Sequence, residues 1–241
     1  MTHYPKSGLM SIRIFIPIFS AYINYNPLPF RKFLLLSIIL TKGFVTTAQT
    51  RFSFFAGPQA TTVHYVVRGS EQSTDFKFGF QAGAGAKIEF DNRLYFTPAI
   101  YYSLKGYKVV LKQGAYPPGL LAINNNTTIH TLETAFLLQY DFSSRSSHFF
   151  FKGGPSLDFQ LAGREKFDLG DGSRINRKMK YGFADYGHYA ASAIVQVGYE
   201  TTSNYIFYVH YAHGLTNLNN ADEGPSVFYR VLGISIGKYF K

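Results

Sequence analysis

Most of this chain alternates between two kinds of residue at every second position, which is the spacing of a β-strand with two different faces. Between residues 76 and 90, Phe, Ala and Ile occupy the even positions, and Lys, Gly, Gln and Glu occupy the odd ones. Residues 148–163 repeat the pattern. We expect eight such strands, near residues 51–63, 76–90, 94–107, 127–142, 148–163, 186–200, 204–213 and 227–240. The fold class predicted from this pattern is all-β.

The connections between the predicted strands alternate between long and short. The short ones are Asp91–Arg93, Ser143–Ser147 and Thr201–Ser203, and the long ones cover residues 64–75, 108–126, 164–185 and 214–226. Short turns at one end and long loops at the other are typical of outer-membrane barrels. Many predicted strands also exceed the roughly 9–11 residues that a tilted strand needs to cross a membrane. An even strand number predicts that both ends of the barrel chain are periplasmic.

The two faces favour a membrane barrel over a soluble one. One face carries Phe, Tyr, Leu, Ile, Val and Ala, which suits lipid, and the other carries Gly, Ser, Gln and ionisable residues. Eight strands leave room inside only for side chains. We therefore predict an eight-stranded antiparallel up-and-down transmembrane β-barrel with a filled lumen. Pro58, Pro98 and Pro155 lie inside predicted strands, where we expect β-bulges, since proline cannot donate to the strand ladder.

Residues 1–48 are typical of an export leader. They contain five Lys and Arg, no Asp or Glu, and an apolar run after Arg31 and Lys32. Removing those five cations lowers the formal net charge from +10 to +5, so half of the basic excess belongs to the leader. Residues 1–29 make it longer than an ordinary signal peptide, and a mis-set translation start is one explanation. The expected organisation is a leader at 1–48 and a barrel at 49–241.

Several short stretches resemble the PorT-like outer-membrane β-barrel family of Bacteroidetes-type envelopes, over roughly residues 50–241. The stretches are Phe80–Gly85, Pro98–Gly106, Leu132–Tyr140, Phe151–Pro155, Asp185–Gly187, Val197–Glu200 and Arg230–Gly237. Thr134 and Ala135 depart from the family pattern, which often has a proline after Glu-Ile. The resemblance implies an eight-stranded barrel in the outer membrane and, for some relatives, a link to type IX protein secretion. It supplies no catalytic residues.

Three ionisable residues on the polar face are the sharpest local signal. Counted from the periplasmic ends, Lys105, Glu133 and Asp158 lie at similar depth on three consecutive strands. Ionisable groups inside a membrane protein normally face its interior and pair there. We expect a structural network in the lumen. A proton or ion pathway is the alternative.

An enzyme would need a histidine with an oriented partner at the outer rim. Asp185, His188 and His210 are the candidates, but strand counting places His188 high in the lumen and His210 nearer the periplasmic end. Neither a Gly-x-Ser-x-Gly nor a His-Glu-x-x-His motif occurs. We therefore expect no catalytic residues and no enzymatic activity. The absence of cysteine excludes disulfides and thiolate metal sites, and we expect no metal and no cofactor.

The connection after residue 163 is rich in cations that could contact lipopolysaccharide phosphates. They are Arg164, Lys166, Arg174, Arg177, Lys178 and Lys180. Arginine favours forked hydrogen bonds to phosphate, although a solvated loop has the same composition. No nucleic-acid-reading module appears in the sequence.

These observations predict an outer-membrane protein with a structural or interaction role in the cell envelope. The expected partners are membrane lipid, lipopolysaccharide, and envelope or secretion proteins. An outer-membrane enzyme acting at the outer rim and a small-solute pore are the alternatives.

Overall fold

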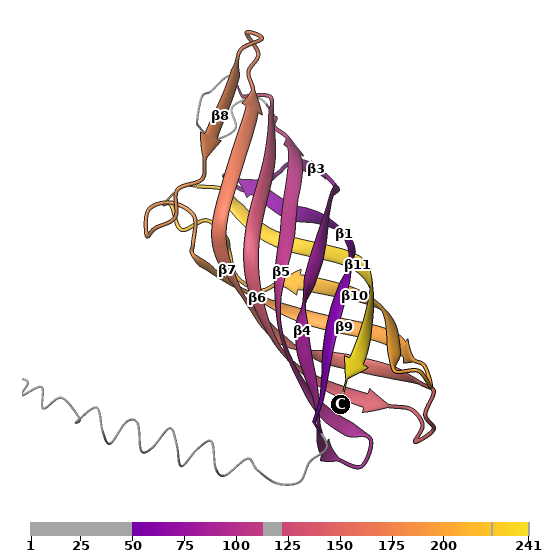
Figure 1. Ribbon diagram of the computed structural model, residues 1–241. Coiled ribbons are helices and arrows are strands. Elements are labelled where there is room, and N and C mark those ends of the chain that lie inside the picture. Colours follow the sequence, from indigo (N-terminus) through magenta and orange to yellow (C-terminus); the bar gives the residue numbers. More distant parts are fainter. Residues whose placement is uncertain (1–49, 113–121, 223, 241) are drawn as a thin grey trace, which may run out of the picture. The chain divides into compact units, whose positions relative to one another are not determined.

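The computed structural model describes residues 50–112, 122–222 and 224–240. The expected leader, residues 1–48, lies outside the described residues. The described chain forms one antiparallel sheet (Figure 1). Its strands are β1 (Arg51–Val67), β2 (Ser70–Glu71), β3 (Ser73–Asp75), β4 (Lys77–Asp91), β5 (Leu94–Val110), β6 (Asn124–Asp141), β7 (His148–Asp168), β8 (Arg174–Lys178), β9 (Tyr189–Glu200), β10 (Tyr205–Gly214) and β11 (Ser226–Phe240).

Eight of these strands close into a ring. Their order is β11-β10-β9-β7-β6-β5-β4-β1, and β1 pairs with β11 from Phe52 opposite Phe240 to Val66 opposite Ser226. The short strands β2, β3 and β8 are additions that pair with β1, β5 and β7. The predicted eight-stranded antiparallel barrel is confirmed. Closure gives each of the eight ring strands two neighbours.

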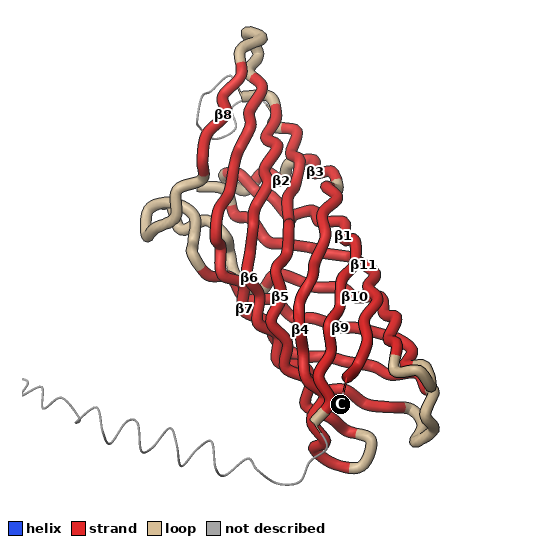
Figure 2. Tube along the Cα trace, in the orientation of Figure 1, coloured by secondary structure: helices blue, strands red, loops and turns tan. Residues whose placement is uncertain are grey.

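The two ends of the barrel differ. The connections between β4 and β5, β6 and β7, and β9 and β10 are short and lie at the end where β1 begins and β11 finishes. We call this the turn end, and the opposite end the loop end. The hairpin of β7 and β8 projects from the loop end (Figures 1 and 2). Residues 164–168 and 174–178 were predicted as loop, but they form paired strands. The reason is that Phe167 and Ile175 point inward and so continue the alternation of the two faces.

The predicted two faces are confirmed by the exposure of the side chains. Large apolar side chains stand on the outer surface of the ring, among them Phe54, Phe78 and Ile234. The opposite parity points inward, where Gln81, Ser103 and Gln139 are buried. In the described part of the chain, no helix combines the length and apolar character needed to cross a membrane.

The expected bulges at the prolines are wrong. The strand register is the same on both sides of Pro58, Pro98 and Pro155, and each proline lies where the pairing to one neighbour is interrupted. The continuous ladder to the other neighbour holds the register, so the missing N–H does not require an extra residue. The register shifts occur instead between Glu89 and Asp91 in β4 and between His130 and Thr131 in β6.

The lumen holds both apolar clusters and charged side chains. Toward the turn end, Phe150, Ile206, Tyr208 and Tyr239 form one apolar cluster. A larger cluster extends to the loop end and includes Tyr107 and Tyr229, both almost fully buried. Charged side chains lie in the same lumen, and they form the candidate sites.

Candidate functional site

A central ion network joins the three residues singled out from the sequence. Lys105 Nζ lies 2.7 Å from Glu133 Oε1 and 2.7 Å from Asp158 Oδ2, and all three side chains are buried. Glu133 is directly opposite Asp158 in the register, but Lys105 is opposite Ile129, four residues along β6. Barrel strands tilt against the axis, so side chains at one depth come from different register positions. The structure brings the three together; their role in fixing the barrel remains a prediction.

Polar and aromatic neighbours complete this central network. Thr131 Oγ1 donates to Glu133 Oε1 at 3.1 Å, and Lys105 Nζ lies 5.0 Å from the centre of the Tyr229 ring. His210 is buried and close enough to interact with the Glu133 and Lys105 charges. Neither Tyr229 nor His210 was predicted as part of the network. Their positions on the inward-facing side of their strands could have indicated them.

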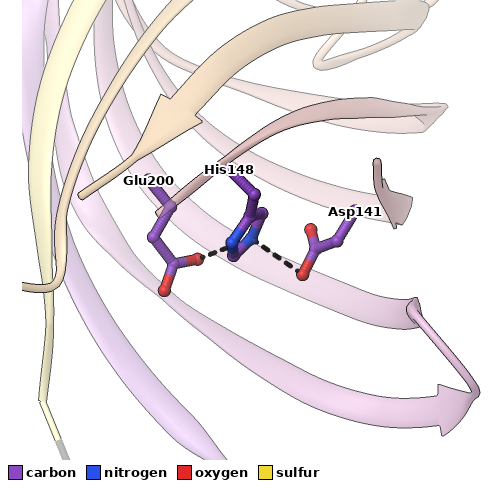
Figure 3. Close-up of side chains that lie close together, drawn as sticks. All are labelled: Asp141, His148 and Glu200. Carbon is purple, nitrogen blue, oxygen red and sulfur yellow. Dashed lines mark ion pairs between the residues drawn. The ribbon is translucent and has the colours of Figure 1, made fainter. Parts of the chain in front are cut away.

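A second ion network, which was not predicted from the sequence, lies at the turn end. Lys87 Nζ lies 2.6 Å from Asp141 Oδ2 and 3.1 Å from Glu200 Oε2. Arg51 pairs with the other Glu200 oxygen at 2.6 Å. The His148 ring lies between the two acids (Figure 3), with Nε2 3.0 Å from Asp141 Oδ2 and 3.5 Å from Glu200 Oε2. The network ties the beginning of β1 to β4, β6, β7 and β9.

Asp141, His148 and Glu200 have the composition of a metal site, and their ligand atoms lie within 4.8 Å of one another. The Nδ1 of His148 is 2.8 Å from the carbonyl oxygen of Arg145, which is the orientation that metal-binding histidines often have. However, the Lys87 ammonium already forms ion pairs with Asp141 Oδ2 and Glu200 Oε2, the two carboxylate oxygens that a metal would need. With Arg51 on Glu200, the acids are neutralised by the protein itself. We therefore interpret this group as an ion-pair network.

The six predicted basic residues are exposed on the β7–β8 hairpin and the segment that follows it. Two have acidic partners: Arg174 Nε is 2.8 Å from Asp168 Oδ1, and Arg177 Nε is 2.8 Å from Glu165 Oε2. Within the described residues, no ion pair involves the other four, Arg164, Lys166, Lys178 and Lys180. At the hairpin tip, hydrogen bonds from Ser173 to the Asp171 carboxylate lower the pKa of that group.

Loop residues also cover the lumen at the loop end. Tyr186 donates its hydroxyl to Glu165 Oε1 at 2.6 Å, and Leu218 and Met179 are buried beneath the loops. Burial, with a contribution from the Glu165 charge, raises the pKa of Tyr181 to about 12. The pKa of Tyr186 is raised well above its ordinary range, first by burial and then by Tyr107 and Glu165. Both tyrosines thus remain hydrogen-bond donors at neutral pH. We call this arrangement the loop cap.

The residues considered for catalysis are not gathered at one place. Asp185 and His188 are exposed in the connection between β8 and β9, whereas His210 is buried beside the central network. The expected position of His188 inside the lumen is wrong, because β9 begins only at Tyr189 and His188 precedes it. The ring of His188 lies against Tyr181 and Tyr189 instead.

A closed ring of eight long strands with an apolar outside and a filled, partly charged inside defines a small transmembrane β-barrel. The chain belongs to the family described as "Outer membrane protein beta-barrel domain", whose sequence model matches residues 47–220. This membership confirms the outer-membrane localisation. A search of curated protein sequences found no match.

Three solved structures illustrate what the fold is similar to. Ail of Yersinia pestis is 12% identical with a TM-score of 0.43, and the match covers 79% of this chain and 98% of Ail. Neisserial surface protein A is 16% identical with a TM-score of 0.42, covering 78% of this chain and 97% of that one. OprG from Pseudomonas aeruginosa is 12% identical with a TM-score of 0.42, covering 80% and 97%.

Proposed function

We propose that this protein is a closed, non-conducting outer-membrane barrel that acts by contacting other envelope components at its loop end. The filled lumen is the observation that supports this most strongly. Two buried ion networks and the apolar clusters around Phe150 and Tyr107 occupy the lumen, and the loop cap lies over them. A small-solute pore would need a continuous water-filled passage through these side chains.

The orientation and the export route belong to the same proposal. Residues 1–48 would direct export, the turn end with both ends of the barrel chain would face the periplasm, and the loop end would face outward. The alternation of short turns and long loops supports this orientation. A role close to that of PorT-like proteins, linked to protein secretion, is supported by the order of the short motifs that resemble that family.

We further propose that the protein is not an enzyme. The separation of buried His210 from exposed Asp185 and His188 supports this, since general acid–base chemistry needs its groups within hydrogen-bond reach.

The proposed contact surface is the basic hairpin of β7 and β8. Arg164, Lys166, Lys178 and Lys180 are exposed cations without an ion pair in the described residues, so they are available to an anionic partner. Lipopolysaccharide phosphates at the cell surface are such a partner, and acidic envelope or secretion proteins are another. Arg174 and Arg177 instead hold the hairpin to its own acids.

A crosslinking pull-down from native envelopes tests this proposal. The hairpin variant would carry Arg164→Gln, Lys178→Gln and Lys180→Gln, which spare the buried Phe167 and Met179. The matched control, with the same loss of charge at the turn end, would carry Arg93→Asn, Arg145→Gln and Lys238→Gln. We expect less lipopolysaccharide and fewer crosslinked proteins with the hairpin variant and an unchanged yield with the control. Equal recovery with all three proteins would contradict the proposed contact surface.

A further inference from the structure

Three lysines from three strands gather on the outer surface near the loop end. Lys108 of β5 and Lys166 of β7 are both exposed and both lie opposite Asn126 of β6 in the strand register. Lys77 Nζ of β4 donates to Asn126 Oδ1 and Thr128 Oγ1, each at 2.6 Å. We call Lys77, Lys108 and Lys166 the lysine cluster.

Lys77 is held in this position by side-chain and backbone oxygens of β6. Its Nζ also donates to the carbonyl oxygen of Thr127 at 3.0 Å, so three oxygens of β6 fix the ammonium. The stem crosses β5 at Gly106, where an added Cβ would lie 2.5 Å from the carbonyl oxygen of Thr127 and 2.7 Å from Lys77 Cδ. The glycine therefore makes the room that lets a lysine of β4 reach β6. The Lys77 ammonium is therefore fixed in place by its contacts.

The positive charge of the lysine cluster is not balanced by nearby acids. Lys108 and Lys166 are close enough to repel the Lys77 ammonium. The neighbouring acids Glu165 and Asp168 are engaged by Arg177 and Arg174. Asp75 lies opposite Lys108 in the register, but no ion pair joins them within the described residues. An anion bound among the three ammonium groups would relieve their repulsion.

The lysine cluster lies near the loop-end margin of the apolar outer surface, beside the exposed Val110 and Ile123. Phe78 and Phe80 of β4 and Leu161 of β7 are exposed on the side toward the turn end. On the other side, a hollow lined by Asn126, Lys166 and Asn176 continues from the cluster. Phosphate headgroups occupy this boundary between hydrocarbon and water in a bilayer, and they attract cationic side chains there.

We propose that the lysine cluster binds a phosphate group of lipid A, the membrane anchor of lipopolysaccharide. This inference rests on the proposed outward orientation of the loop end and names the lipid group that the proposed contact would recognise. Lys108 and Lys166 would donate hydrogen bonds to the phosphate from two sides. The three N–H groups of Lys77 are already donated to β6, so Lys77 would attract the phosphate through its charge alone. Hydrogen bonds between ammonium and phosphate are charge-assisted and therefore stronger than neutral ones.

Binding of phosphorylated and dephosphorylated lipid A to the detergent-solubilised barrel, measured by native mass spectrometry, tests the inference. The variant Lys108→Gln/Lys166→Gln leaves the anchored Lys77 in place, so its barrel should fold. We expect at least about tenfold weaker binding of phosphorylated lipid A and no change for the dephosphorylated lipid. A second variant, Lys77→Gln, removes the third ammonium while keeping a polar side chain, and it should also weaken the binding of phosphorylated lipid A.

Arg145→Gln/Lys238→Gln is the matched control, because it removes two cations from the turn end and should leave lipid A affinity unchanged. An equal loss in this control, or equal affinity for the two lipid forms, would overturn the inference. Complete displacement by millimolar inorganic phosphate would also overturn it, since the site would then serve free phosphate. Surface labelling of the loop end in cells tests the orientation separately, and lipid binding by the purified barrel does not depend on that result.

Discussion

Lys105 neutralises two buried carboxylates, so its replacement by methionine should destabilise the barrel. Without the ammonium, Glu133 and Asp158 face each other in the lumen, and breaking a buried ion pair typically costs about 3–5 kcal/mol. Urea unfolding followed by heat-modifiable gel mobility measures this loss. Lys108→Met, on the outer surface, is the control and should change the unfolding midpoint little. An unchanged unfolding midpoint in Lys105→Met would contradict the proposed structural role of the central network.

Tyr186 is expected to hold the loop cap through its hydroxyl. Tyr186→Phe removes the donor to Glu165 while keeping the ring, and a hydrogen bond to a charged group contributes about 1.5–3 kcal/mol. Hydrogen exchange should therefore become faster in the connection between β8 and β9, and stay unchanged in β4 and β5. Tyr181→Phe is a suitable comparison, because within the described residues its hydroxyl donates only to the Met179 sulfur, at 3.9 Å. Equal exchange in the two variants would argue against the cap.

At the scale of single residues, part of the candidate site could be predicted from the sequence. Lys105, Glu133 and Asp158 could be predicted because period two fixes which side chains point inward. The turn-end network was missed because Asp141 and His148 flank a connection and Arg51 begins a strand, positions where parity alone does not show burial. Lys77 was also missed, since its odd position predicts an inward side chain, although its stem crosses Gly106 to reach β6.

At the scale of strands, β1 and β11 approach each other closely at Gly57, in the seam that closes the barrel. A Cβ on Gly57 would lie 1.9 Å from the carbonyl oxygen of Ile234, a backbone atom that cannot move aside without shifting a strand. Gly57→Ala should therefore lower the yield of folded barrel and reduce stability by about 1–3 kcal/mol or more. Folding into detergent micelles, followed by heat-modifiable mobility, measures both effects.

Gly153→Ala is the matched control for that change. Its new Cβ would first meet the Phe151 ring at 3.3 Å, and an exposed side chain can move. If the two alanine variants folded equally well, the β1–β11 seam would not be as tight as the structure indicates.

The existence of each long strand could be predicted, but not its full length. β7 runs to Asp168 and pairs with β8, where the sequence suggested a loop from residue 164. The high content of Lys, Arg, Asp and Gly in this segment concealed the alternation of Phe167 and Ile175 with charged residues. The prolines led to a prediction of β-bulges that was wrong. A strand with two neighbours keeps its register when the hydrogen-bond ladder to one of them is interrupted.

For the whole molecule, closure of the ring could be predicted from strand number, loop alternation and the two unlike faces. How the lumen is filled could not, since the arrangement of aromatic and charged side chains depends on strand tilt and shear. Tyr107 and Tyr229, for example, are almost fully buried, although their residue type is equally common on the outside of a barrel. The filled lumen is therefore a result of the structure and the basis of the proposed function.

Planar-bilayer recording of the purified barrel tests the non-conducting lumen most directly. We predict a current that stays at the baseline of the protein-free membrane, because buried side chains and the loop cap block the path. A general porin reconstituted in parallel shows that insertion can be detected, and heat-modifiable mobility shows that the inserted protein is folded. Stable, reproducible single-channel steps from the folded protein would contradict the closed lumen and with it the proposed function.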